Sequence, residues 1–163
     1  NIKGLDIAIK IFKETKKKYK DKNFILNIFG EIKKNYFNDQ DINLLGKIDD
    51  ENKLKLIYSA SNILINTSRL ESFGLIAQEA LSTGLPIIIL DNTGTKDLIK
   101  SNEMGFVFKS SSLENIDDFF NWINKIDENF NSKKINEIIS NHFSYEKIGK
   151  DYSNLIKKYL LHN

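Results

Sequence analysis

The sequence predicts an α/β domain in which helices cover both faces of a parallel sheet. Short apolar segments alternate with helical patterns along the chain, and this alternation is typical of doubly wound sheets. The segment Pro86-Ile87-Ile88-Ile89-Leu90 is too apolar for a strand with one solvated face. At 163 residues the chain has room for one domain with a hydrophobic core, but not for two of full size. We therefore expect residues 1–163 to form a single three-layer, Rossmann-like domain.

The order of the elements follows from the spacing of apolar residues. Leu5, Ala8, Ile9 and Phe12 lie at helical spacing and predict an amphipathic helix from residue 5 to about residue 18. Short apolar runs bounded by Gly or polar residues predict strands. In chain order, the next expected elements are strands at 24–29 and 42–46, a helix at 52–60, a strand at 62–66, a helix at about 75–81, a strand at 86–90, a short helix near 97–99 and a strand at 105–108.

The last third of the chain is expected to be helical. Ser111 and Glu114 have the spacing of a capping box, which predicts that a helix begins there. Its buried face would consist of apolar residues at helical spacing, namely Ile116, Phe119, Phe120, Ile123 and Ile126. Two more helices are expected near residues 133–140 and 145–161. Tyr152 and Tyr159 lie at helical spacing in the last of these, and we expect them in the core.

The composition excludes several classes of site. With no Cys, the chain has neither disulfides nor thiolate metal ligands. The formal net charge is +2 and Arg69 is the only arginine, so nucleic-acid binding is poorly supported. The basic cluster of Lys16-Lys17-Lys18 with Lys20 and Lys22 is either the solvated end of a helix or a contact for phosphate or an anionic membrane. No apolar run approaches the roughly 18 residues of a membrane span, and we expect a cytoplasmic protein.

A strand–loop–helix unit at residues 62–81 carries the strongest chemical signal. Glu71 precedes the expected helix, Gly74 lies at its start and Glu79 lies about one and a half turns inside it. The first amide groups of a helix lack intrahelical partners, so phosphate or sugar oxygens are natural ligands there. Gly74 has no side chain and lets a ligand approach the backbone. The two carboxylates then either bind separate hydroxyl groups of an extended ligand or are ordinary exposed residues.

The surrounding residues favour the first of these interpretations. The string R-L-E-S-F-G-L-I-A-Q-E-A-L-S-T-G-L-P-I-I-I resembles the donor-binding signature of glycosyltransferase family 4, whose members have the two-domain GT-B fold. The matching positions are Glu71, Phe73, Gly74, Glu79, Ala80, Gly84 and Pro86. The resemblance runs from about Lys3 to Tyr152. It implies that the chain is the C-terminal, donor-binding half of such an enzyme.

The resemblance also implies a role for each matching residue. Lys3 would contact the donor diphosphate, and the segment from Ile42 to Ile48 would hold the nucleobase through its backbone. Glu71 would contact the donor sugar and act in catalysis, and Glu79 would take the ribose hydroxyls. The backbone after Glu71 would meet sugar and phosphate at three positions, Phe73, Gly74 and Leu75.

Two segments depart from the family pattern, and a third resembles it. Thr93-Gly94-Thr95-Lys96-Asp97 stands where the family has Gly-Gly-x-x-Glu, and Gly30-Glu31-Ile32 replaces Gly-x-Gly. Phe143-Ser144-Tyr145-Glu146 resembles the Phe-Ser-Trp segment ahead of the terminal helix. Residues 143–163 would therefore cross towards an N-terminal acceptor domain that the sequence does not contain.

The first strand of the family's donor domain also has no counterpart in the sequence. That strand is central in the 3-2-1-4-5-6 order of such sheets. Without it, the strand at 24–29 would either pair directly with the strand at 62–66 or leave a gap for another segment. We infer that the chain is the larger part of a donor domain from a longer protein.

The reaction that the resemblance implies is transfer of a sugar, with retention, from a nucleotide-sugar to an acceptor hydroxyl. A UDP-sugar is the expected donor, and bacterial polysaccharide or glycolipid assembly the expected pathway, with peripheral membrane contact through the full-length protein. No metal cofactor is expected. Asp39-Gln40-Asp41 has the Asp-x-Asp form of metal-dependent transferases, but it precedes a strand, so we interpret it as a turn.

Two alternatives remain. One is a nucleotide-sugar-binding module or partner subunit without catalysis, and the other is a GT-B sugar-nucleotide epimerase. A dehydrogenase is disfavoured, because no Gly-x-Gly-x-x-Gly follows a strand.

Overall fold

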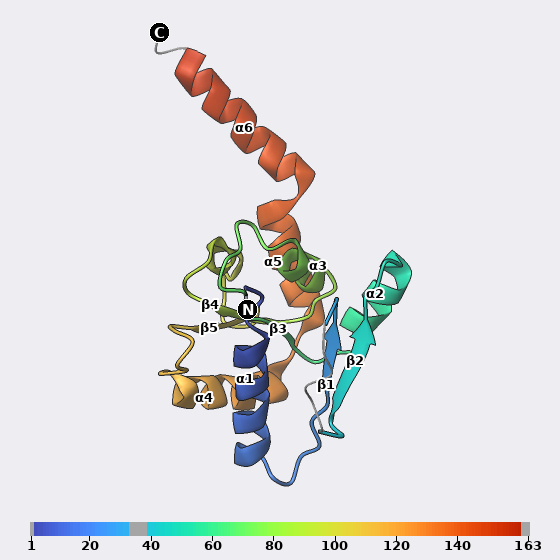
Figure 1. Ribbon diagram of the computed structural model, residues 1–163. Coiled ribbons are helices and arrows are strands. Elements are labelled where there is room, and N and C mark those ends of the chain that lie inside the picture. The colour runs from blue at the N-terminus through green and yellow to red at the C-terminus, as the bar shows by residue number, and fades with distance from the viewer. Residues whose placement is uncertain (1, 33–38, 161–163) are drawn as a thin grey trace.

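The computed structural model describes residues 2–32 and 39–160 of the chain (Figure 1). The strands in these ranges are β1 (Leu26–Phe29), β2 (Ile42–Gly46), β3 (Leu64–Asn66), β4 (Ile87–Leu90) and β5 (Gly105–Phe108). The helices are α1 (Leu5–Lys18), α2 (Glu51–Ser59), α3 (Leu75–Ser82), the 3-10 helix η1 (Gly94–Leu98), α4 (Ile116–Asn129), α5 (Ser132–Phe143) and α6 (Tyr145–Leu160). Every element expected from the sequence is present; the expected helix end at residue 161 lies outside the described residues.

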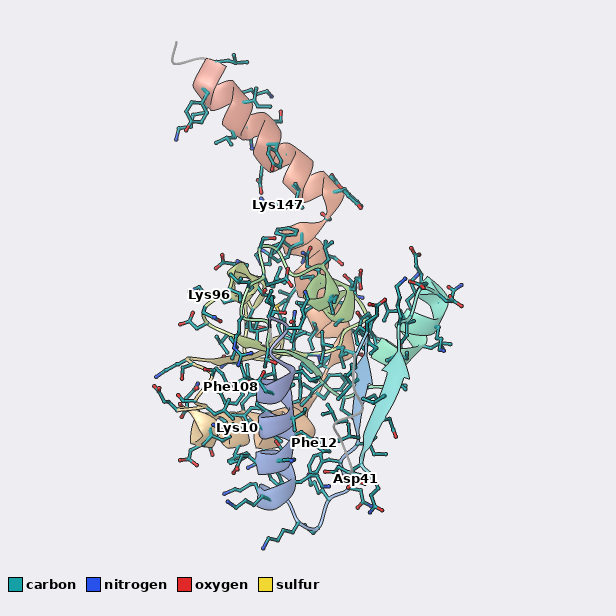
Figure 2. All side chains as sticks on the ribbon, viewed as in Figure 1. Lys10, Phe12, Asp41, Lys96, Phe108 and Lys147 are labelled. Atoms are coloured by element: carbon teal, nitrogen blue, oxygen red, sulfur yellow. The ribbon has the colours of Figure 1, made fainter. Side chains whose placement is uncertain are left out.

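Strand β4 lies at the centre of the core and is buried on both faces. Ile87 and Ile89 point into a core formed with α3 and α5, whereas Ile88 and Leu90 point into a second core formed with α1 and α4. Successive side chains of a strand point to opposite faces, so an apolar run of this kind needs helices on both sides. The body therefore has helix–sheet–helix layers, with Phe108 of β5 inside it (Figure 2).

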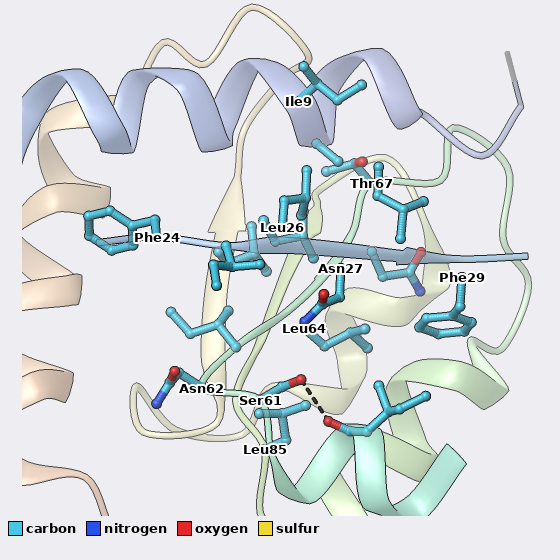
Figure 3. Close-up of a pocket in the computed structure, with 18 of the residues that line it drawn as sticks. Ile9, Phe24, Leu26, Asn27, Phe29, Ser61, Asn62, Leu64, Thr67 and Leu85 are labelled. Carbon is cyan, nitrogen blue, oxygen red and sulfur yellow. Dashed lines mark hydrogen bonds between the residues drawn. The ribbon is translucent and has the colours of Figure 1, made fainter. Parts of the chain in front are cut away.

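The expected α/β class with parallel strands is confirmed, but the sheet is interrupted. β1 pairs in parallel with β2, and β3, β4 and β5 pair in parallel in that order. Of the two alternatives for the strands at 24–29 and 62–66, the structure shows the gap. A cavity of about 1620 Å³ separates β1 from β3, and Leu26 and Leu64 are among the residues that line it (Figure 3).

The prediction of a capping box at Ser111 and Glu114 is wrong. Helix α4 begins at Ile116, and Glu114 instead accepts hydrogen bonds from the hydroxyls of Ser110 and Ser112 at 3.1 and 2.8 Å. The reason is Leu113, which has a φ of 65° and so interrupts a helical path before α4. The expected apolar face of α4 is confirmed, because its five residues pack in the second core.

Helix α6 projects away from the body and buries none of its residues (Figure 1). Tyr152 and Tyr159 are 64% and 68% exposed, so the expectation that they lie in the core is wrong. The helix packs mainly against α5 and has no sheet beneath it. Within the ranges that the structure describes, no helix is both long and apolar enough to cross a bilayer.

Replacing Ile88 by Ala should lower the free energy of unfolding by about 2–5 kcal/mol, because it removes buried apolar area and leaves a cavity. Ile88 is 1% exposed. Chemical denaturation followed by circular dichroism measures the change. Ile156→Ala on α6 is the matched control, since Ile156 is 56% exposed and should change stability by less than about 0.5 kcal/mol. Equal losses in both variants would contradict the central position of β4.

Candidate functional site

Helix α3 begins at a glycine with a left-handed backbone. Gly74 has φ 69° and ψ 55°, a region that residues with a side chain rarely adopt. The loop that leads to Gly74 starts at the carboxyl end of β3, and the loop after β4 starts at the same edge because the two strands are parallel. The free amides at the start of α3 therefore emerge where ligands bind in open α/β sheets.

The loop after β4 closes tightly against the start of α3. A Cβ on Gly74 would lie 2.7 Å from Cγ2 of Thr95, and a Cβ on Gly94 would lie 2.5 Å from the carbonyl oxygen of Ser72. Both glycines thus permit contacts that a side chain would prevent. Thr95 is 1% exposed, and its hydroxyl has no hydrogen-bond partner among the described residues. The altered loop at 93–97 therefore supports the start of α3 and leaves one buried polar atom unsatisfied beside it.

The segment before α1 is fastened to the loop after β3. The Thr67 hydroxyl donates a hydrogen bond to the Gly4 carbonyl at 2.8 Å, and the Arg69 amide donates to the Ile2 carbonyl at 2.7 Å. A Cβ on Gly4 would lie only 1.8 Å from the carbonyl oxygen of Thr67. Glycine at this position is what allows residues 2–4 to lie against residues 67–69.

Two ion pairs follow from that contact. Lys3 Nζ lies 3.4 Å from Glu71 Oε2, and Arg69 donates two hydrogen bonds of 2.9 and 2.6 Å to the Asp6 carboxylate. These bonds from Arg69 lower the pKa of Asp6. The Lys3 side chain is 69% exposed, so its attraction to Glu71 is weakened by solvent. An anionic group can therefore replace Glu71 as the partner of Lys3 at little cost.

Glu79 is held by a buried tyrosine. The Tyr58 hydroxyl on α2 donates a hydrogen bond of 3.2 Å to Glu79 Oε2 on α3. Tyr58 is only 3% exposed, whereas Glu79 is exposed. Burial, followed by the nearby Glu79 charge, raises the pKa of Tyr58 well above its ordinary value. The hydroxyl therefore stays protonated and remains a donor to the carboxylate.

The other predicted residues are less closely connected. Phe73 and Leu75 are 53% and 67% exposed on either side of Gly74, and Gln78 Nε2 donates to the Phe73 carbonyl at 3.1 Å. Ile48 is half-buried in the loop between β2 and α2. None of the hydrogen bonds or ion pairs found among the described residues joins Ile48 to the other predicted site residues.

The Asp-x-Asp segment is a turn, as the sequence predicted. The Asp41 amide donates a hydrogen bond of 3.1 Å to Asp39 Oδ1, and both carboxylates face Lys16, at 2.5 Å for Asp41 and 3.7 Å for Asp39. The positive charge of Lys16, part of the basic cluster, is thereby balanced by these carboxylates. In the part of the chain that the structure describes, no three His, Cys, Asp or Glu side chains gather in a way that would hold a metal ion.

Three contributors to the site were not predicted: Tyr58, the Asp6–Arg69 pair and the Thr95 hydroxyl. Tyr58 lies 21 residues before its partner Glu79, and Asp6 lies 63 residues before Arg69. No local spacing reveals such pairs. The clue available for Thr95 was the departure of its loop from the family pattern, which marked a difference without showing its consequence.

The chain is similar to known proteins in sequence and in fold. Residues 1–151 match the family described as glycosyl transferases group 1. An uncharacterized glycosyltransferase of Haemophilus influenzae is 28% identical over 120 residues, which are 69% of this chain and 33% of that protein. The alpha-1,3/1,6-mannosyltransferase ALG2 of Dictyostelium discoideum is 27% identical over 116 residues, which are 68% of this chain and 26% of that protein.

Solved structures share the fold. Anabaena Alr3699/HepE in complex with UDP and glucose superposes with a TM-score of 0.69 and 16% identity, covering 96% of this chain and 45% of that chain. The GtfA/B complex superposes with a TM-score of 0.67 and 20% identity, covering 97% of this chain and 34% of that chain. At these identities the likeness shows the fold alone.

The family match takes in the fastened segment at residues 2–4, the start of α3 and both carboxylates beside it. The chain spans only a third or less of the two curated relatives, 33% and 26% of their lengths. The match nevertheless covers residues 1–151 of the 163. The chain belongs to the glycosyl transferases group 1 family.

Proposed function

We propose that this chain is the donor-binding part of a retaining glycosyltransferase that transfers a sugar from a nucleotide-sugar to an acceptor hydroxyl. The observation that carries the proposal is the start of α3, where the first helix amides follow Gly74 and where Glu71, in the loop before it, pairs with the exposed Lys3. Amides and a cation at one point suit a diphosphate. A carboxylate at the same point suits sugar hydroxyls.

The proposed roles follow from this arrangement. The amides after Gly74 and the Lys3 ammonium bind the diphosphate, Glu71 contacts the sugar, and Glu79 takes the ribose hydroxyls. During transfer the bond between the anomeric carbon and the diphosphate oxygen breaks, and that oxygen keeps the electron pair. A bond to the acceptor oxygen forms on the same face, and the proton of the acceptor hydroxyl passes to the leaving diphosphate. Negative charge builds up on the leaving diphosphate, and fixed donors at that point stabilise it.

The nature of the donor, acceptor and setting is also proposed. A UDP-sugar is the donor that we favour, because Anabaena Alr3699/HepE, which shares the fold, was solved in complex with UDP and glucose. We propose the backbone near Ile48 as the nucleobase contact and expect no metal cofactor. We propose that the full-length protein acts in polysaccharide or glycolipid assembly in a bacterial cytoplasm, at the membrane surface.

A partner subunit without catalysis is the second candidate. The observation that favours it is the GtfA/B complex among the similar structures. Donor binding without turnover by the full-length protein would support this candidate over the enzyme.

Glu79→Ala should weaken UDP binding about tenfold or more, because it removes a charged hydrogen-bond acceptor. Lys3→Ala should weaken it several-fold through loss of an exposed cation. Isothermal titration of the chain with UDP, GDP and UDP-glucose measures both effects and identifies the preferred base.

The matched controls for this titration are Glu137→Ala and Lys13→Ala, which change two exposed residues of α5 and α1 with no proposed contact to the nucleotide. Neither should change the affinity beyond about twofold. Binding that is insensitive to Glu79 and Lys3 would contradict the proposed site, even if nucleotide binds.

We further propose that the chain is completed by an added strand between β1 and β3, supplied by polypeptide that leads into residue 2 in the full-length protein. Ile2 and Gly4 lie at the carboxyl end of β3, fastened to its loop. A strand that ended there would run parallel to its neighbours, and α1 would then form its crossover to β1. Such crossovers are ordinary in this class of fold.

The backbone on both sides of the cavity is oriented to accept such a strand. The amides of Leu26 and Leu64 bond towards β2 and β4, to the carbonyls of Asp41 and Pro86. Since successive amides of a strand point to opposite edges, those of Asn27 and Ile65 point towards the cavity. Free strand edges of this kind readily pair with added polypeptide.

A five-residue extension, Val-Ile-Val-Ile-Val, placed before Asn1 should slow amide hydrogen exchange at Asn27 and Ile65 about tenfold or more, because these amides would gain ladder hydrogen bonds. Leu26 and Leu64, which are already bonded, serve as internal controls. The same extension with Pro at its second and fourth positions is the matched control. Exchange that is unchanged at Asn27 and Ile65 would contradict the added strand.

A further inference from the structure

We propose that Tyr58 is a positioning residue, which aims the Glu79 carboxylate at the ribose of the bound donor. The inference rests on the proposed function, because it takes Glu79 to be the ribose ligand. It adds a residue of α2 to a site otherwise built from α3, the loop before it and the segment ahead of α1.

The hydrogen bond fixes one carboxylate oxygen and leaves the other open. The Tyr58 hydroxyl donates to Oε2 of Glu79 at 3.2 Å, and no other hydrogen bond to this carboxylate is found among the described residues. Glu79 is exposed, so a ligand can approach its side chain. An exposed Glu on a helix otherwise has several rotamers of similar energy, and a ligand that needs one of them must order it.

The ring that carries the hydroxyl is itself held rigidly. Tyr58 is 3% exposed within the core of α3, β4 and α5, and its ring packs edge-on against Phe29 with centroids 6.2 Å apart. Phe29 is the last residue of β1. The Tyr58 hydroxyl is therefore held in position by the core and by β1, and its position does not depend on the ordering of a loop.

The protonation state supports the same role. Burial and the Glu79 charge keep the pKa of Tyr58 far above neutral pH, so the hydroxyl donates throughout the physiological range. A group with a fixed proton can orient a carboxylate without competing for its charge.

The simpler possibility is that Glu79 only satisfies the buried hydroxyl. In that case Tyr58→Phe would change stability and leave nucleotide selectivity unchanged. The positioning role instead predicts a change in recognition of the ribose. Nucleotide selectivity therefore distinguishes this role from a purely structural one.

The test compares UDP with 2′-deoxy-UDP by titration calorimetry. In the unmodified protein, UDP should bind about tenfold more tightly, because Glu79 accepts a hydrogen bond from the 2′-hydroxyl. Tyr58→Phe should reduce the ratio of the two affinities about threefold to fivefold, mainly by weakening the binding of UDP. In a Glu79→Ala background the Tyr58→Phe change should have no further effect on the ratio.

Tyr19→Phe is the matched control, since the Tyr19 hydroxyl bonds to the Phe120 carbonyl and Asn124, far in the fold from Glu79. It should leave the ratio unchanged. A Tyr58→Phe protein that binds both nucleotides with the original ratio, or weakens both equally, overturns the inference while the proposed function stands. Failure of the unmodified, folded protein to bind UDP, GDP or ADP overturns the proposed function and this inference together.

Discussion

The contact between Gly4 and Thr67 is the constraint on which the site depends. A side chain at position 4 would collide with the Thr67 carbonyl, and the hydroxyl of Thr67 bonds back to Gly4. Because these two residues touch, Lys3 reaches Glu71, and Asp6 reaches Arg69. The start of α1 and the loop before α3 thus act as one unit, and the groups proposed to bind diphosphate and sugar come from segments 68 residues apart.

The same unit explains how an interrupted sheet still presents a site. β4 and its two cores hold α1, α3, α4 and α5 in place, and Phe29 of β1 packs against the first of these cores. The smaller sheet of β1 and β2 carries α2, and most of α2 is exposed. Tyr58 is the buried residue of α2, and it packs into the larger body through the same core as Ala77 and Leu81. Its packing in that core and its hydrogen bond to Glu79 therefore connect the two parts of the fold where the sheet does not.

The sequence predicted what local patterns can encode. Apolar spacing located the helices and strands, and the string around Gly74 indicated both the fold family and the residues at the start of α3. Tertiary contacts decided the rest. The capping box failed because Leu113 turns the chain before α4, and Tyr152 was misplaced because an amphipathic face does not show what covers it. The Tyr58–Glu79 bond was invisible because neither residue departs from an ordinary helical pattern.

The contacts proposed for the donor would come from both sheets. If the backbone near Ile48 holds the base, that contact belongs to the sheet of β1 and β2, whereas Lys3, Glu71 and the amides after Gly74 belong to the larger body. A nucleotide bound in this way loses affinity whenever the two parts move relative to each other, since each contact fixes only one part. Occupation of the cavity between β1 and β3 would join the sheets through continuous hydrogen bonds and reduce that motion. Donor affinity and the added strand are then thermodynamically coupled, and each should strengthen the other to the same extent.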